Sequence, residues 1–343
     1  MTEKTFGFAI IGCGAIARIH VEAIASLQNA RLTAVYDKNA DQAVAFAQEF
    51  GCRSYDSAEK MLEDPDVDIV SICVPSGLHA KFAVLAANAK KHIVVEKPMA
   101  IATQQLDEMT RAVAENGVKI TVIVQMRFQE NVKLVKAAID EGRLGRIYFA
   151  DCRMRFYRSP EYYRNGGWRG TWEMDGGGAL MNQGIHGIDL MQYLMGGVKS
   201  VYADCRTMAR QIETEDTANL LVEYRNGAIG VIQSTTIAVP GEPRTITISG
   251  EKGTVVLQED AIVRWDVEGE SLATGETDVG SCQDPMAFSF GCHALQLRDL
   301  LDAIREDRPS AVDATEGRKA VDLILAAYRS SQTGQKVLLP QEA

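Results

Sequence analysis

One stretch of the chain collects the side chains that acid–base chemistry needs. Residues 175–190 read DGGGALMNQGIHGIDL and place Asn182, His186 and Asp189 at positions i, i+4 and i+7. On a helix these side chains form one polar stripe. An imidazole has a pKa close to neutral pH and can accept the proton of a substrate hydroxyl. A structural His–Asp pair on a packed helix is the alternative interpretation, and the stripe alone does not decide between the two.

A second candidate is Lys97, which lies in the sequence VVEKP at residues 94–98. The apolar residues before it predict a parallel strand, and ligands bind over the carboxyl ends of such strands. An ammonium group in that position stabilises an alkoxide and disfavours protonation of a nearby histidine. A surface ion pair between Lys97 and Glu96 is the alternative.

Gly12, Gly14 and Ala17 form a G-x-G-x-x-A motif between a predicted strand (residues 6–11) and a predicted helix (residues 15–28). The first glycine permits a tight turn, and the second lets the backbone approach a pyrophosphate. The small third residue allows the helix to pack closely on the strand. The motif therefore predicts a dinucleotide site.

Asp37 lies at the end of the second predicted strand, 20 residues after Ala17. A carboxylate in that position binds the adenine ribose hydroxyls and repels a 2′-phosphate, which favours NAD over NADP. Lys38 beside it carries the opposite charge, so NADP remains the less favoured cofactor rather than an excluded one.

Two groups of elements must position these residues. Up to residue 125, short apolar strands alternate with helices, which predicts parallel βαβ units. Beyond that point, successive strands joined by short turns predict a mostly antiparallel sheet. Its later strands are expected near residues 198–210, 216–225, 228–238, 244–250 and 253–264.

Length and composition agree with this division. A chain of 343 residues is long for one core, so two domains are expected. The net charge of −10 argues against a nucleic-acid partner. The seven cysteines are scattered without a C-x-x-C motif, which favours reduced thiols in a cytoplasmic protein and predicts no metal site. No apolar run reaches the length of a membrane span, and no signal peptide is recognised.

Together these motifs resemble the oxidoreductase family that groups glucose–fructose oxidoreductase, inositol dehydrogenase and the rhizopine catabolism protein. The matching pieces are residues 11–20, Asp37, residues 74–100 and residues 176–190, so the resemblance covers nearly the whole chain. It implies an α/β protein with a Rossmann-type, doubly wound parallel sheet in residues 1–125. It also implies an α+β domain in residues 126–343, built on a large open, mostly antiparallel sheet.

The resemblance further implies hydride transfer between NAD(P) and a hydroxyl-bearing carbon of a sugar or polyol, in homodimers or homotetramers formed through the C-terminal sheet. Lys97 and His186 are expected to act on the substrate hydroxyl, with Asn182 and Asp189 as further catalytic candidates. The residues expected to hold the cofactor are Gly12, Cys13, Gly14, Ala15, Ile16, Asp37, Lys38, Pro75, Ser76, His79, Glu96, Lys97 and Gln125.

Asn182 departs from the inositol dehydrogenases, which carry an aspartate four residues before the histidine. An amide can hold a hydroxyl or the imidazole, but it cannot accept a proton. The Asn-Gln-x-x-His form is similar to family members that oxidise the C3 hydroxyl of nucleotide-linked amino-sugar uronates.

Arginines are concentrated near residues 153–169 of this acidic protein. Guanidinium groups bind carboxylate or phosphate, and aromatic rings stack on sugars or bases. An anionic substrate and an ordinary solvated loop explain the pattern equally well. The substrate-binding candidates are Arg127, Arg158, Tyr163, Arg164, Trp168 and Arg169.

Two other functions stay open at this point. One is a glycosidase or lyase that oxidises C3 transiently and restores it, and the other is a non-catalytic sensor that binds the nucleotide. Accumulation of free NADH with substrate separates the first from a dehydrogenase, and the intact pair of Lys97 and His186 argues against the second.

Overall fold

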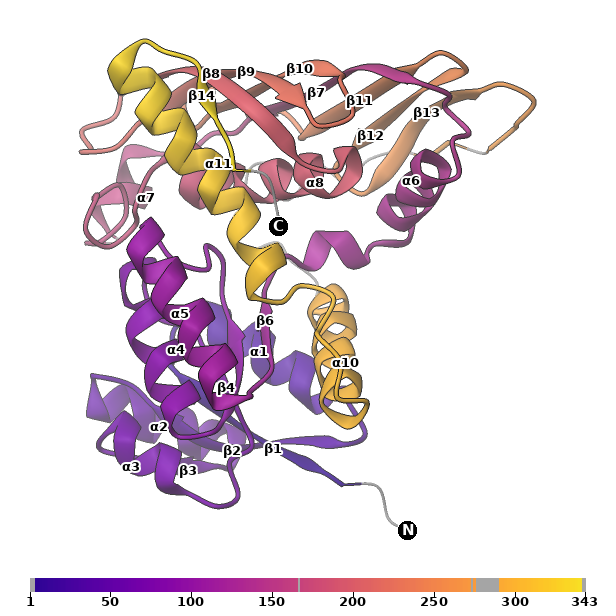
Figure 1. Cartoon of the computed structure of the whole chain (residues 1–343). Coiled ribbons are helices and arrows are strands. Elements are labelled where there is room, and N and C mark those ends of the chain that lie inside the picture. The colour runs from indigo at the N-terminus through magenta and orange to yellow at the C-terminus, as the bar shows by residue number, and fades with distance from the viewer. Residues whose placement is uncertain (1–3, 166, 273, 276–289, 341–343) are drawn as a thin grey trace. The chain divides into compact units, whose positions relative to one another are not determined.

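The computed structural model describes residues 4–165, 167–272, 274–275 and 290–340. Its internal contacts divide the chain into two compact units. The first unit is formed by Met1–Gln125 and Ser289–Arg318, and the second by Met126–Phe288 and Lys319–Ala343. The chain therefore leaves the first unit after Gln125 and returns to it late in the sequence (Figure 1).

The first unit is built on a parallel sheet with the strand order β3-β2-β1-β4-β5-β6. This is the order of doubly wound dinucleotide-binding folds, and it confirms the predicted parallel sheet. The strands are β1 (Phe6–Ile11), β2 (Ala30–Tyr36), β3 (Arg53–Ser54), β4 (Ile69–Ile72), β5 (His92–Val95) and β6 (Ile120–Val122). The helices are α1 (Ala15–Ala25), α2 (Ala40–Phe50), α3 (Ala58–Glu63), η1 (Ser76–Leu78), α4 (His79–Asn88), α5 (Thr103–Asn116) and α10 (Gly291–Arg305).

Helices cover both faces of this sheet. Every residue of β1 and β4 is buried, as the continuous apolar runs in these strands predict. On one face, α1, α2 and α10 contribute to a single hydrophobic cluster. On the other face, α4 and α5 pack against each other (Figure 1). The connecting loops therefore lie at the carboxyl ends of the strands.

Residues near the C-terminus complete the edge at β6. The side-chain nitrogen of Gln296, in α10, donates to the carbonyl of Val122 at 2.7 Å, and its oxygen accepts from the N–H of Val124 at 3.2 Å. The hydroxyl of Ser310 donates to the carbonyl of Ile120 at 2.6 Å. These bonds satisfy backbone groups that an edge strand would otherwise expose.

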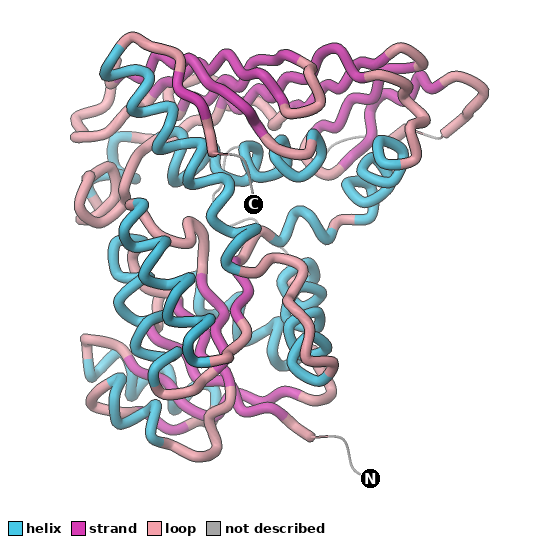
Figure 2. Tube along the Cα trace, in the orientation of Figure 1, coloured by secondary structure: helices cyan, strands magenta, loops and turns pink. Residues whose placement is uncertain are grey.

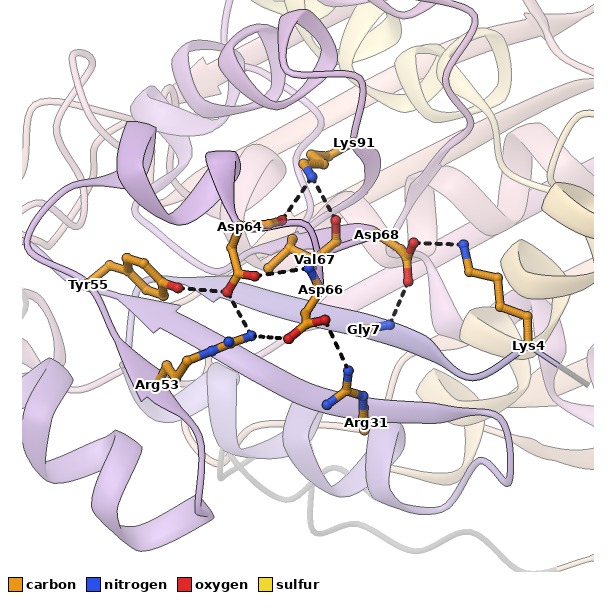
Figure 3. A network of polar contacts seen from close by, with 10 residues as sticks. All are labelled: Lys4, Gly7, Arg31, Arg53, Tyr55, Asp64, Asp66, Val67, Asp68 and Lys91. Atoms are coloured by element: carbon orange, nitrogen blue, oxygen red, sulfur yellow. Dashed lines mark hydrogen bonds and ion pairs between the residues drawn. The ribbon is translucent and has the colours of Figure 1, made fainter.

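A network of charged side chains lies near the amino ends of β1 and β4 in the first sheet (Figure 3). Asp64, Asp66 and Asp68 precede β4. Arg53 lies 2.7 Å from a carboxylate oxygen of Asp64 and 2.9 Å from one of Asp66, and Lys4 donates to Asp68 at 2.8 Å. This acidic group is therefore balanced by basic side chains and ties the strand starts together.

The second unit is built on a mixed sheet with the order β13-β12-β11-β7-β10-β9-β8-β14. Among the described strands of this second sheet, only β7 and β10 pair in parallel, so the predicted mostly antiparallel sheet is confirmed. The strands are β7 (Ile147–Arg155), β8 (Val198–Arg206), β9 (Thr217–Tyr224), β10 (Ile229–Thr235), β11 (Thr245–Gly250), β12 (Gly253–Gln258), β13 (Ala261–Val267) and β14 (Val337–Leu338). The helical segments are η2 (Gln125–Phe128), α6 (Glu130–Asp140), α7 (Pro160–Arg164), η3 (Ala179–Gly184), α8 (Ile185–Met195) and α11 (Ala314–Thr333), which begins in the first unit.

One face of this sheet carries α8, with α6 beside it (Figures 1 and 2). Strand residues on this inner face are buried, for example Cys152, Leu220 and Ile232. No helix of the described residues lies along the other face, which we call the outer face. The alternation of buried and exposed residues along β9 matches a sheet with one packed side.

Two local predictions differ from the structure. The single strand expected at residues 253–264 is wrong, because β12 and β13 form a hairpin there. The arginine-rich segment interpreted as a loop contains the short helix α7, whose N-cap is Ser159. Within the described part of the chain, no helix combines the length and the apolar character that crossing a membrane requires.

Candidate active site

The glycine-rich loop of the first unit joins β1 to α1. Gly12 has φ +95°, and a side chain there would collide with the carbonyl of Cys73. Gly14 is the N-cap residue of α1, and a Cβ on it would point into open space. The N-terminus of α1 has no side-chain cap, so its N–H groups are available to an anion. Ala15 and Ile16 form its first turn.

Asp37 closes this loop from the end of β2. Its carboxylate accepts from the N–H of Cys13 at 2.8 Å and from the N–H of Asn39 at 2.8 Å. Gln42 donates to the carbonyl of Cys13 at 2.7 Å. Lys38 is exposed beside this site. Burial, followed by the charge of Asp37, raises the pKa of the Cys13 thiol to about 12, so this cysteine stays neutral.

These observations fit a bound dinucleotide. The open side of Gly14 leaves room for a pyrophosphate, and the carboxylate of Asp37 keeps acceptor capacity for ribose hydroxyls. At the end of β6, the side-chain oxygen of Gln125 is buried and has no hydrogen-bond partner among the described residues. Such an atom needs a partner from a ligand or from water.

His79 links the loops that follow β4 and β5. Its Nδ1 lies 2.7 Å from the carbonyl of Pro98, and its Nε2 lies 3.0 Å from the carbonyl of Val74. Burial lowers the pKa of His79, and the hydrogen bonds to the two carbonyls act in the opposite direction. Pro75 and Ser76 lie in the loop that this ring fixes. His79 thus shapes the loop next to Lys97, whose peptide bond to Pro98 is cis.

Glu96 anchors the residue before Lys97 to the interior. Its carboxylate accepts from His20 Nε2 at 2.9 Å and from the N–H of Lys97 at 3.2 Å. His20 Nδ1 lies 2.6 Å from the hydroxyl of Ser71. Burial raises the pKa of Glu96, but the hydrogen bond and charge of His20 outweigh it and hold this pKa at about 2. Glu96 and His20 therefore form a buried ion pair.

His293, in α10, completes a group that the sequence did not indicate. Its Nε2 lies 3.9 Å from Glu96 Oε1, and the ligand-type atoms of His20, Glu96 and His293 all lie within 4.8 Å of one another. This spacing is compatible with a metal ion. The hydrogen bond between His20 and Glu96 accounts for their contact without one, so we assign the group a structural role.

In the second unit, the predicted polar stripe has a different local shape. Residues 179–184 form the π-helical turn η3, which runs directly into α8. His186 is the second residue of α8 and is buried. Asn182 lies in η3, and its amide nitrogen donates to the carboxylate of Asp175 at 2.7 Å. π-helical turns are rare and frequently occur at functional sites.

Asp189 pairs with Arg127 rather than with solvent. The guanidinium donates through Nε and Nη2 to the two carboxylate oxygens, at 2.9 and 2.7 Å, and both side chains are buried. The same guanidinium lies over the ring of Tyr193, 4.9 Å from its centroid. This pair fastens α8 to η2, so the structure brings together two residues that the sequence assigned to different roles.

The three glycines before η3 provide room for neighbouring protein groups. A Cβ on Gly177 would overlap the hydroxyl of Tyr328, and a Cβ on Gly178 would overlap the carbonyl of Glu215. The carboxylate of Glu215 also accepts from the N–H groups of Gly178 and Leu180. Burial raises the pKa of Glu215 to about 7, although these hydrogen bonds lower it.

Aromatic and arginine side chains gather beside η3. The guanidinium groups of Arg158 and Arg169 lie over the ring of Tyr162, at 5.8 and 4.3 Å from its centroid. Gln183 donates to the Tyr162 hydroxyl at 2.8 Å and to the side-chain oxygen of Asn182 at 2.9 Å. Its own oxygen accepts from Arg158 at 2.8 Å. A continuous polar chain therefore joins a buried guanidinium to Asn182.

The other substrate-binding candidates are less directly connected to this series of polar contacts. Tyr163 is buried, and its hydroxyl donates to Thr236 at 2.9 Å. Arg164 is exposed and pairs with Glu161. Trp168 lies against the guanidinium of Arg169.

Five residues that hold the candidate segments of the two units in place were not among the predicted site residues. These are His20, Asp175, Gln183, Glu215 and His293. Asp175 lies directly before the three consecutive glycines, and Gln183 lies directly after Asn182. These positions in the sequence were the available signal. Glu215, His20 and His293 come from distant segments and carried none.

A model described as oxidoreductase family, NAD-binding Rossmann fold, matches residues 6–124, and the GFO/IDH/MocA C-terminal domain matches residues 132–256. WlbA dehydrogenase from Bordetella pertussis, in complex with NADH and UDP-GlcNAcA, is 36% identical with a TM-score of 0.89, over 99% of this chain and 100% of that one. The chain belongs to this oxidoreductase family.

Several curated relatives of this oxidoreductase are named dehydrogenases. Myo-inositol 2-dehydrogenase of Thermotoga maritima is 26% identical over 97% of this chain and 98% of the relative. D-glucoside 3-dehydrogenase of Escherichia coli is 26% identical over 99% of both chains. The predicted family, NAD cofactor and enzyme class, an NAD-dependent dehydrogenase acting on a hydroxyl-bearing carbon, are confirmed. The glycosidase, lyase and sensor alternatives are not favoured.

Proposed function

We propose that this dehydrogenase oxidises the C3 hydroxyl of a nucleotide-linked amino-sugar uronate. The observation that carries the proposal is the polar chain from Arg158 through Gln183 and Asn182 to Asp175. It ties a buried guanidinium, which suits a carboxylate or a phosphate, to the segment just before His186. The similarity to WlbA, whose structure holds UDP-GlcNAcA, supports the same substrate class.

The cofactor is proposed to bind the first unit. Gly12, Gly14 and the first turn of α1 would hold the pyrophosphate, and Asp37 would accept the adenine ribose hydroxyls. When bound, NAD supplies the acceptor for the hydride that leaves the substrate carbon. The remaining cofactor-binding residues that we propose are Cys13, Ala15, Ile16, Lys38, Pro75, Ser76, His79, Glu96, Lys97 and Gln125.

The proton is proposed to move to His186. Its imidazole accepts the proton of the C3 hydroxyl, and the ammonium group of Lys97 stabilises the oxygen as negative charge develops. Asn182 orients the substrate or the imidazole, because an amide can hydrogen bond to both. Asp189 acts indirectly, because its pair with Arg127 holds α8 in place.

The anionic part of the substrate is proposed to meet the arginine and aromatic group. Arg158 and Arg169 supply charge, and Tyr162 and Trp168 supply flat surfaces that stack on a sugar or a base. Tyr163 and Arg164 lie in the same short helix, α7, where Tyr163 contributes to the shape of the segment and Arg164 to its charge.

We propose that the protein forms homodimers or homotetramers through the outer face of the second unit. Phe149, Tyr202, Leu221 and Ile229 are all exposed on that face, where strand register places Tyr202 opposite Leu221 and Ile229 opposite Phe149. Such a row of large apolar side chains is typical of protein interfaces. A cytoplasmic location stays a prediction from the cysteine pattern.

The substrate assignment is tested by supplying NAD with each of three compounds: UDP-GlcNAcA, myo-inositol and a D-glucoside. We expect NADH to accumulate with the nucleotide sugar and the product to be a 3-keto sugar. If NADH forms with myo-inositol and not with the nucleotide sugar, the proposed substrate class is wrong. A cleaved sugar without net NADH would instead revive the lyase alternative.

The site assignment is tested with two variants. Lys97→Met is expected to lower kcat at least 100-fold, because it removes the charge that stabilises the alkoxide. Arg169→Met is expected to raise the KM for the nucleotide sugar about 10-fold with a small change in kcat. Undiminished turnover by the Lys97 variant would refute its role.

A further inference from the structure

A buried carboxylate holds the start of η3 from outside the segment. Glu215 lies two residues before β9, and its carboxylate accepts from the N–H of Leu180 at 2.8 Å and from the N–H of Gly178 at 3.1 Å. Its backbone carbonyl accepts from the N–H of Ala179 at 2.9 Å. One residue therefore satisfies three successive N–H groups at the beginning of a helical segment, where such groups otherwise lack partners.

Glu215 is itself held from a third element. The hydroxyl of Tyr328, in α11, donates to Glu215 Oε1 at 3.0 Å, and Tyr328 is buried. The backbone must come very close to both groups, since a side chain on Gly177 or Gly178 would overlap them. The consecutive glycines are thus explained by this contact, which joins η3 to β9 and α11.

The held segment leads without a break to the proposed base. The N–H of Asn182 donates to the carbonyl of Gly178 at 3.1 Å, and η3 continues into α8 at Ile185, one residue before His186. A shift at residues 178–180 is therefore passed along a hydrogen-bonded helix to the imidazole. A catalytic group that is misplaced by about 1 Å can lower the rate on the order of 100-fold.

We propose that Glu215 is a positioning residue for the reaction: by holding the first N–H groups of η3, it sets where Asn182 and His186 stand. The proposal rests on the proposed role of His186 as the base. It differs from a merely stabilising role, because a stabilising contact affects how much enzyme is folded and leaves the placement of His186 in the folded enzyme unchanged.

The first test observes His186 directly and needs no substrate. Histidine-labelled protein is compared by NMR as wild type, Glu215→Gln and Ser330→Ala, with His186 and His79 assigned by single substitutions among the five histidines. The glutamine keeps the shape but turns an N–H donor toward the N–H of Gly178 or Leu180. We expect the ring signals of His186 to shift in Glu215→Gln and those of His79, in the first unit, to stay.

Ser330→Ala is the matched control, because Ser330 is a buried residue of the same helix as Tyr328 and accepts from the N–H of Ala203 at 3.0 Å. It is expected to lower stability without moving the His186 signals. Unshifted His186 signals in folded Glu215→Gln would overturn the proposal. If that variant does not fold, Glu215→Asp replaces it, since the shorter carboxylate keeps the charge and cannot span both N–H groups.

The second test measures turnover. We expect kcat of Glu215→Gln to fall at least 10-fold, with the KM for NAD within about twofold of wild type, because the cofactor residues lie in the first unit. Wild-type kcat in the folded variant would also overturn the proposal. If the wild type itself yields no NADH with UDP-GlcNAcA, the proposed substrate fails, and the NMR comparison still decides whether Glu215 positions His186.

Discussion

Asp189 looked like a catalytic partner of His186 because it lies three residues away on a helix. Its carboxylate instead forms a two-bond pair with Arg127, and both groups are buried. Spacing along a helix shows which of its side chains can contact each other. It does not show which side chain of another element contacts them. Arg127 comes from η2, and only the folded second unit brings it to α8.

Removing one member of this pair leaves a buried charge without its partner. Asp189→Asn is therefore expected to lower the free energy of unfolding by about 3–5 kcal/mol. Urea unfolding measures the loss. The control is Lys60→Gln, which breaks an exposed pair with Asp56 and should change this free energy little. Equal losses in the two variants would contradict a structural role for Arg127 and Asp189.

Glu215 predicts a dependence of stability on pH. Its pKa rises from 4.5 to about 7 in the folded protein, so the folded state holds this proton more tightly than the unfolded state. The resulting stability is fully present below pH 4.5 and is lost as the pH rises through about 7, a change of about 3 kcal/mol.

Glu215→Gln cannot lose a proton at this position. Between pH 5 and pH 8, the wild type should therefore lose about 2.5 kcal/mol more unfolding free energy than the variant does. Urea unfolding of both proteins at the two pH values gives the comparison. Parallel losses in the two proteins would show that Glu215 does not titrate in this range.

At the level of elements, the turn before α8 depends on close approach rather than on chain flexibility. Gly178→Ala is expected to destabilise the second unit by at least about 3 kcal/mol, because its Cβ would overlap the carbonyl of Glu215. Gly51→Ala is the control, since Gly51 has φ +67° with open space around it and should cost only about 1 kcal/mol. Thermal unfolding of both variants distinguishes crowding from backbone strain.

Most elements that position the site could be predicted from the sequence. The strands of the first unit are continuous apolar runs, and the dinucleotide motif marks the join between β1 and α1. The hairpin of β12 and β13 was missed because its turn, at Glu259 and Asp260, has neither glycine nor proline, although Glu259 adopts φ +48°. A positive φ at a glutamate cannot be recognised from the residue type.

The shape of the candidate site was only partly predictable. Asn182 and His186 were found from their types and spacing, but the π-helical turn between them has no composition of its own. It forms because Glu215, Tyr328 and Asp175 hold the segment from other elements. These contacts join residues between 7 and 113 positions apart, and a periodic pattern in the sequence does not indicate them.

For the whole molecule, the outer face of the second unit carries the strongest prediction. Leu221→Glu places a charge among apolar side chains and is expected to shift the protein from an oligomer to a monomer, because a buried charge opposes association. Val44→Glu, which changes an exposed apolar residue of α2 in the first unit, is the control. Sedimentation velocity measures both variants, and a monomeric wild type would contradict the proposed interface.

The late return of the chain to the first unit affects the order in which this protein is made. A ribosome completes β6 before it synthesises residues 126–288, and only then does it produce Gln296 and Ser310, which satisfy the backbone of that strand. At ordinary translation speeds this interval lasts roughly 10 to 40 seconds. The nascent nucleotide-binding unit must therefore persist with an incomplete edge while β7 to β13 of the second sheet are synthesised; only β14 of that sheet follows later.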